Sequence, residues 1–95
     1  MIEYLYDVIR ATSGQPISIS AKLTKEDSGA ILTPCELHLF DDEKMIAAAT
    51  GIHLGDGVWQ FEIAAEATKG RTGRHWYCIG NEGLSLCFKK PLYLI

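Results

Sequence analysis

The stretch Gly73–Phe88 reads Gly-Arg-His-Trp-Tyr-Cys-Ile-Gly-Asn-Glu-Gly-Leu-Ser-Leu-Cys-Phe. Two apolar runs flank Gly80–Gly83, where glycines permit the positive φ angles of a tight turn. The pattern predicts a β-hairpin, the strongest such signal in the chain. Alternation assigns one face of it to the core, namely His75, Tyr77, Ile79, Leu84, Leu86 and Phe88. The other face is not plainly polar, so we expect it to be partly covered too: Trp76, Cys78, Ser85, Cys87 and Lys89.

Five other segments have strand-like patterns or composition. They are Ile2–Ile9, Ile17–Thr24, Cys35–Leu39, Met45–Gly51 and Val58–Ile63. The alanines of Met45–Gly51 would also suit a helix, but the segment is short, so we favour a strand opposite Cys35–Leu39. Ala64–Lys69 is predicted as one helical turn that ends at Gly70. Pro91 is expected to confine the end of the hairpin to a sheet edge or a bulge.

These elements predict one domain over residues 1–95. Seven short strands separated by turn residues are typical of an antiparallel β-sandwich, so the expected fold class is all-β with layers of three and four strands. Between the layers we expect a core of Ile17, Ile19, Leu37, Leu39, Trp59, Phe61, Tyr77 and Leu86. At roughly 1.5–3 kcal/mol for each fully buried large side chain, this core suffices without a disulfide or a metal.

The net charge of −3 argues against a nucleic-acid partner, because phosphate neutralisation needs a basic patch. The basic cluster Lys69, Arg71 and Arg74 is expected on a solvated loop. No apolar run approaches the ~20 residues of a membrane span, so no membrane partner is expected. The start Met1–Tyr4 lacks the basic region of a signal peptide, which places synthesis and folding in the cytoplasm.

An odd number of cysteines, three, fits that compartment better than a disulfide framework. We therefore expect Cys35, Cys78 and Cys87 to be reduced, and thiol titration of the freshly prepared, denatured chain to find all three. A Cys78–Cys87 bridge across the hairpin is the alternative, and a count of one thiol would show that this or a similar bridge had formed.

Recognisable catalytic motifs are missing, so we expect no enzyme and no cofactor. Lys69–Gly73 superficially suggests a phosphate loop but lacks its spacing. Asp41–Glu43 offers carboxylates to calcium, although acids at a turn are usually solvated. Zinc would need widely spaced residues from separate strands to converge, and no metal is expected. Its candidate ligands are Cys35, Cys78, Cys87, His38, His53 and His75, of which His38 and His53 are expected on solvent faces and His75 at a strand edge.

Four aromatic residues are candidate partner contacts. Trp76 is either a platform for sugar stacking or a packed strand residue. Tyr4, Tyr6 and Tyr93 lie in the apolar chain ends, which we expect at sheet edges, where unpaired backbone groups invite another chain. Tyrosine suits such half-wet interfaces, and the alternative is that the two ends pair with each other and close the sandwich.

The segment Gly73–Cys78 resembles the entry to the sixth strand of immunoglobulin-like (Ig-like) sandwiches, where a small residue precedes an aromatic corner and a Tyr-Cys pair. Two departures are visible, since Cys35 lies on the third strand instead of the second and that strand has no tryptophan. The whole chain is similar to small Ig-like proteins of phage and prophage structural modules. The shared stretches are Gly14–Ile19, Gly57–Ile63 and Lys69–Tyr77.

The resemblance implies a virion part at the head, neck or tail, and it assigns no functional residue. The expected function is therefore a non-enzymatic assembly protein of a phage-type particle, with other virion subunits or further copies of itself as partners. It would fold in the host cytoplasm and then join the virion. The alternative is an Ig-like module that binds carbohydrate or protein through Trp76 or through its loop tips.

Overall fold

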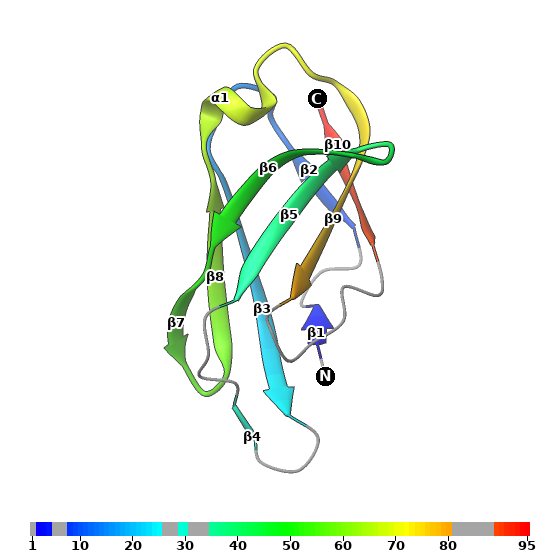
Figure 1. The fold of residues 1–95 in the computed structure, drawn as a ribbon. Helices are drawn as coiled ribbons and strands as arrows, with labels where there is room; N and C mark the ends of the chain where they lie inside the picture. Colours follow the sequence, from blue (N-terminus) through cyan, green and yellow to red (C-terminus); the bar gives the residue numbers. More distant parts are fainter. Residues whose placement is uncertain (1, 5–7, 26–28, 31–34, 81–88) are drawn as a thin grey trace.

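The computed structural model describes residues 2–4, 8–25, 29–30, 35–80 and 89–95. Within them, ten strands form two five-stranded sheets that face each other (Figure 1). Sheet I has the order β1-β3-β8-β7, with β4 also paired to β3, and sheet II has the order β2-β10-β9-β5-β6. Sheet I consists of β1 (Ile2–Tyr4), β3 (Ile17–Lys25), β4 (Gly29–Ala30), β7 (Ile52–Gly55) and β8 (Val58–Ile63). Sheet II consists of β2 (Ile9–Ala11), β5 (Glu36–Asp41), β6 (Lys44–Thr50), β9 (Gly73–Gly80) and β10 (Lys90–Leu94).

The expected all-β sandwich is confirmed, but two details of the expectation are wrong. Seven strands is too few, and the expected layers of three and four strands are larger. The sheets are also not wholly antiparallel, because β10 pairs with β2 in parallel, with Leu92 opposite Ile9 and Leu94 opposite Ala11. This parallel pair places the C-terminal strand beside the second strand of the chain inside one sheet.

The predicted first strand, Ile2–Ile9, is two strands on different sheets. In β1 the even positions Ile2 and Tyr4 stand opposite Leu23 and Ala21 of β3. In β2 the odd positions Ile9 and Ala11 pack against the core of sheet II. A chain that changes sheets also changes which positions face inward. That change explains why the segment has apolar residues in both registers.

The predicted core is confirmed wherever the structure describes it. Each of its members there is at most 5 % exposed: Ile17, Ile19, Leu37, Leu39, Trp59, Phe61 and Tyr77. Leu86 lies outside the described residues. Ala21, Leu23, Leu92 and Leu94 also belong to this cluster, which the β3–β8 and β9–β10 pairs bring together between the sheets.

Residues 44–55 supply the end strand of each sheet on one side of the sandwich, first β6 and then β7. The choice of strand over helix for Met45–Gly51 is confirmed, since β6 pairs with β5 along its whole length. The chain then crosses at Gly51 to sheet I, where it continues as β7 and pairs with β8 (Figure 1). The sequence interpretation missed β7. Gly51 is the crossing point, and its N–H donates a hydrogen bond to the Cys35 carbonyl oxygen at 2.9 Å.

The core face predicted for the first hairpin strand is confirmed by burial of His75, Tyr77 and Ile79 on β9. A four-residue turn at Gly80–Gly83 would place Tyr77 opposite Leu86, whereas Tyr77 is opposite Lys90. The pairing of β9 with β10 is therefore offset by four residues from that expectation, and residues 81–88 lie outside the described residues.

The expectation that Pro91 marks an edge or a bulge is wrong for β10 as a whole. This strand lies inside sheet II, between β2 and β9. Pro91 precedes Leu92, the first residue of β10 that pairs with β2, so its missing N–H falls outside the stretch that is flanked on both sides.

Of the predictions for His53 and His75, the first is confirmed and the second is wrong. His53 is exposed, as predicted. His75 is not at a strand edge, because it pairs with Leu92 of β10 and is 2 % exposed. Its Nδ1 lies 3.1 Å from the Gly73 carbonyl oxygen, which suits an Nδ1–H donor, and its Nε2 has no hydrogen-bond partner in the described part of the chain.

Helix α1 (Ala65–Thr68) is the predicted helical turn, and it lies at the same end of the sandwich as the C-terminus (Figure 1). Thr68 is fully buried and fixes the turn to the loop after β2. Its Oγ1 accepts a hydrogen bond from the Gly14 N–H at 3.0 Å, and its carbonyl oxygen accepts one from Ser13 Oγ at 2.6 Å. These two bonds tie the connection between β8 and β9 to the N-terminal half of the chain.

We expect Thr68→Val to lower the free energy of unfolding by about 1–2 kcal/mol, because the Gly14 N–H loses its acceptor while the side-chain shape is kept. Denaturant unfolding measures the change. The matched control is Thr72→Val, four positions further on and exposed, which should stay within about 0.5 kcal/mol of the parent protein. Equal effects of the two substitutions would contradict the role assigned to Thr68.

Candidate partner-binding face

The outer face of sheet II carries two neighbouring cross-strand rows, which the register defines. In the first row, Tyr93 of β10 has Arg10 of β2 on one side and Arg74 of β9 on the other. In the second row, Trp76 of β9 lies between Pro91 of β10 and Phe40 of β5. The residues that alternate with these, such as Tyr77, Leu39 and Leu92, are buried in the core, so the two rows face away from it.

Arg74 links the two rows through its guanidinium group. Its Cζ lies 5.6 Å from the centre of the Trp76 ring and 5.8 Å from the centre of the Tyr93 ring. Both distances are within the range of cation–π attraction. Arg74 is exposed, whereas Trp76 and Tyr93 are half-buried. The two rings therefore hold a charged group in place at the surface.

The Lys89 ammonium group lies over the ring of Phe40, the third aromatic residue of the two rows. Lys89 Nζ is 4.1 Å from the centre of the Phe40 ring, and the edge of His38 packs against that ring with 6.4 Å between centroids. His38 Nε2 is hydrogen-bonded to Glu36 at 2.5 Å, so this carboxylate of β5 already has a partner. His38, expected on a solvent face, does lie on the outer face but is half-buried.

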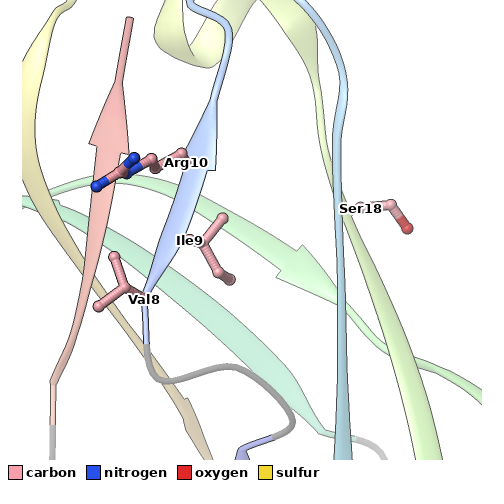
Figure 2. A pocket seen from close by; sticks show the side chains of 4 residues that line it. All are labelled: Val8, Ile9, Arg10 and Ser18. Atoms are coloured by element: carbon pink, nitrogen blue, oxygen red, sulfur yellow. The ribbon is translucent and has the colours of Figure 1, made fainter.

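Arg10 extends the positive charge to the edge of the sheet. Figure 2 shows its side chain directed over β10, whereas the neighbouring Ile9 points toward β3. We call the set of three rings and three cations the aromatic–cation face. Its members are Arg10, Phe40, Arg74, Trp76, Lys89 and Tyr93.

Two of the four predicted contact residues, Trp76 and Tyr93, therefore meet on one surface, through Arg74. Tyr4 lies apart from them in β1 of sheet I, and Tyr6 lies outside the described residues. The interpretation of Tyr93 as an edge residue is wrong, because β10 is an inner strand.

The last residues are also part of the fold. Leu92 and Leu94 are 0 % and 3 % exposed, so removing Leu92–Ile95 would remove core side chains together with Tyr93. The alternative that the two apolar chain ends pair with each other is wrong for the described residues, since β10 pairs with β2, whereas the N-terminal strand β1 pairs with β3 of the other sheet. Substitution of Tyr93 alone is the suitable probe of its surface role.

Sequence reasoning missed four members of the aromatic–cation face: Arg10, Phe40, Arg74 and Lys89. Arg74 was expected on a solvated loop with Arg71, yet it lies within β9, two positions before Trp76 and on the same face. That spacing is the signal that would have revealed it. Arg71 does lie in the loop before β9, where its Nη1 pairs with Asp41 at 3.1 Å.

The remaining sequence candidates are not brought together. In the part of the chain that the structure describes, no three His, Cys, Asp or Glu residues lie close enough to hold a metal ion. Cys35 and Cys78 are both buried, at 2 % and 3 % exposure, and Cys87 lies outside the described residues, so the expected thiol count stays a prediction. Of the segment Lys69–Gly73, the first four residues connect α1 to β9, and Gly73 is the first residue of β9.

A shallow depression lies between β2 and β3 and is lined by Val8, Ile9, Arg10 and Ser18 (Figure 2). The hydroxyl of Ser18 already accepts a hydrogen bond from Gln60 Nε2 at 2.6 Å. Of the other residues that line the depression, Val8 and Ile9 are apolar, and the Arg10 side chain is directed over β10, away from Ser18 (Figure 2). This depression therefore lacks the converging polar groups of a small-molecule site.

One open edge of the sandwich is apolar. β6 ends sheet II and β7 ends sheet I, and both present large exposed side chains. Met45, Ile52 and Leu54 are 50 %, 64 % and 58 % exposed. We expected an exposed apolar sheet edge at the chain ends. The structure has such an edge on residues 44–55, in the middle of the sequence.

Comparisons with known proteins identify no relative: no family model matches the sequence, and no curated protein is detectably similar to it. No helix in the described ranges is long and apolar enough to cross a bilayer.

Proposed function

We propose that this protein is an Ig-like, non-enzymatic binding subunit of a phage-type particle, and that it contacts a neighbouring subunit through the aromatic–cation face. The observation that carries the binding role is the guanidinium of Arg74 placed against both Trp76 and Tyr93 at an exposed sheet surface. Tryptophan, tyrosine and arginine are the residue types that dominate binding energy at protein interfaces.

The strand order supports the Ig-like part of the proposal. Ig-like sandwiches have one sheet in the order A-B-E-D and a second sheet that contains G-F-C, which variable-type domains extend with C′. The order β1-β3-β8-β7 corresponds to A-B-E-D, and β10-β9-β5-β6 corresponds to G-F-C-C′. Strand β9, with its Gly73–Cys78 entry, then takes the place of the sixth strand, F, which is where the sequence resemblance puts it.

The particle role rests on the resemblance to phage structural modules, and gene order tests it. We expect genes for capsid, neck or tail proteins on both sides of this gene, and co-expression with the neighbouring products should give a defined complex. Flanking genes for carbohydrate utilisation, together with binding on a glycan array, would favour the alternative of a carbohydrate-binding module. Arg74 already lies over the Trp76 ring, which leaves less of that ring for a sugar.

Single substitutions test whether the partner binds at the aromatic–cation face or elsewhere on the surface. Trp76→Ala should weaken the complex at least about tenfold, because a half-buried aromatic residue at the centre of the face is truncated. The matched control is Ile52→Ala, an apolar residue 64 % exposed on the other sheet, which should leave the affinity unchanged. Equal affinities of the Trp76→Ala variant and the parent protein would reject this face as the contact surface.

A further inference from the structure

We infer that Arg74 is the anchor of a carboxylate-binding site, and that the segment which docks on the aromatic–cation face is an acidic stretch of a protein partner. This inference rests on the proposed binding role of the face and names the chemistry of its occupant. It starts from the environment of one guanidinium group, between the Trp76 and Tyr93 side chains.

The two rings prepare Arg74 for a planar, two-oxygen ligand. A guanidinium group that stacks on aromatic rings keeps its N–H groups directed outward at the rim of the plane. These donors match the two oxygens of a carboxylate, and such bidentate pairs are among the strongest hydrogen bonds in proteins. Because Trp76 and Tyr93 already limit the rotamers of Arg74, less side-chain entropy is lost when the ligand binds.

The positive charge on this face has no ion-pair partner in the part of the chain that the structure describes. Among the described residues, Arg10, Arg74 and Lys89 make no ion pair, whereas Arg71 on the loop before β9 has Asp41 at 3.1 Å. Arg10 and Arg74 flank Tyr93 in one row, two strand spacings or about 10 Å apart. A segment with several carboxylates would neutralise both cations, and its apolar side chains would lie on the rings between them.

The overall charge favours a protein carboxylate over a nucleic acid. The chain carries a net charge of −3, so the aromatic–cation face is a positively charged patch on a molecule whose overall charge is negative. A long polyphosphate would meet repulsion on either side of this face, because its charge cannot be confined to the width of the sheet. A short acidic protein segment fits the face and meets less of that repulsion.

The test is a titration of the full chain, labelled with ¹⁵N, with four named probes. They are a hexaglutamate peptide, a hexaglutamine peptide of the same length, inorganic phosphate, and a single-stranded oligonucleotide. We expect hexaglutamate to shift the Nε–H signals of Arg74 and Trp76, with an affinity in the millimolar range or tighter that falls as salt is added. Hexaglutamine should shift neither signal, and phosphate should bind more weakly than hexaglutamate because it reaches only one cation.

Three variants test whether hexaglutamate binding depends on the planar guanidinium of Arg74 or on its positive charge alone. Arg74→Lys keeps the positive charge but loses the planar donors that lie against the two rings, so it should weaken hexaglutamate binding at least about fivefold. Arg74→Gln should weaken binding further. Lys22→Gln removes one exposed cation from sheet I and should leave the affinity unchanged. Thermal melting checks that each variant is folded.

Several results would overturn the inference. They are no shift of the Arg74 and Trp76 signals with hexaglutamate, unchanged binding by the Arg74→Lys variant, tighter binding of phosphate, or tighter binding of a single-stranded oligonucleotide. Failure of the proposed function has a different signature. In that case the Trp76→Ala variant binds the neighbouring subunit as well as the parent protein does, whatever the peptides show.

Discussion

Phe61→Ala should lower the free energy of unfolding by about 3–5 kcal/mol, the largest effect that we expect from a single substitution in this chain. Phe61 is fully buried at the centre of β8, opposite Ile19 of β3. Its ring also supports the crossing of the chain from β6 to β7, because a Cβ built on Gly51 would lie 2.7 Å from it. Truncation therefore leaves a cavity where both sheets and the crossing meet.

Two neighbours of Phe61 serve as controls in the same strand. Gln60 and Glu62 alternate with it and face outward, so Gln60→Ala and Glu62→Ala should each change stability by no more than about 0.5 kcal/mol. Gln60 donates a hydrogen bond to Ser18 Oγ, but this bond is exposed to water and is replaced when it is lost. Denaturant unfolding of the three variants measures the pattern. The reverse order of effects would mean that the register of β8 is wrong by one residue.

Gly51→Ala should destabilise the fold by about 1–3 kcal/mol, through overpacking and not through backbone strain. The new Cβ would lie 2.7 Å from Phe61 Cε1 and 2.8 Å from Trp59 Cε3, closer than real Cβ contacts come. Both rings are held in the core, at 0 % and 5 % exposure, so neither can withdraw easily. The crossing between the sheets would have to move outward and weaken its pairing with β5 or β8.

A double-mutant cycle tests this mechanism. Phe61→Leu removes the ring atoms nearest to Gly51, so the cost of Gly51→Ala should be clearly smaller in that background than in the parent protein. Thermal and denaturant unfolding of the four proteins give the coupling. An additive result would show that the methyl group and the Phe61 ring do not interact.

Alternation and turn residues were enough to predict the sandwich and most of its core. The patterns of Ile17–Leu23 and Trp59–Ile63 are regular because each segment stays on one sheet with one face inward. Two of the errors, the single first strand and the missed β7, occur where the chain changes sheets, between β1 and β2 and at Gly51. A local pattern contains no information on which sheet a short segment joins.

The candidate face was predictable only in part, for a related reason. Trp76 and Tyr93 stood out as single aromatic residues, but their proximity depends on the pairing of β9 with β10, which is offset by four residues from the expected hairpin. Phe40 joins them through the pairing of β5 with β9, across a long sequence separation. Arg10 joins through a parallel pair that the antiparallel expectation excluded. Register between distant strands is set by tertiary packing, not by the local sequence.

The most direct test of the central claim is the affinity of this protein for the neighbouring particle subunit that we propose as its partner, measured by titration calorimetry with and without Arg74→Gln. The substitution lies on the surface, so the melting temperature should stay close to that of the parent protein. If the aromatic–cation face is the contact surface and Arg74 its anchor, the affinity falls at least about tenfold, whereas Lys22→Gln leaves it unchanged. An affinity that is the same for Arg74→Gln and the parent protein would contradict the account.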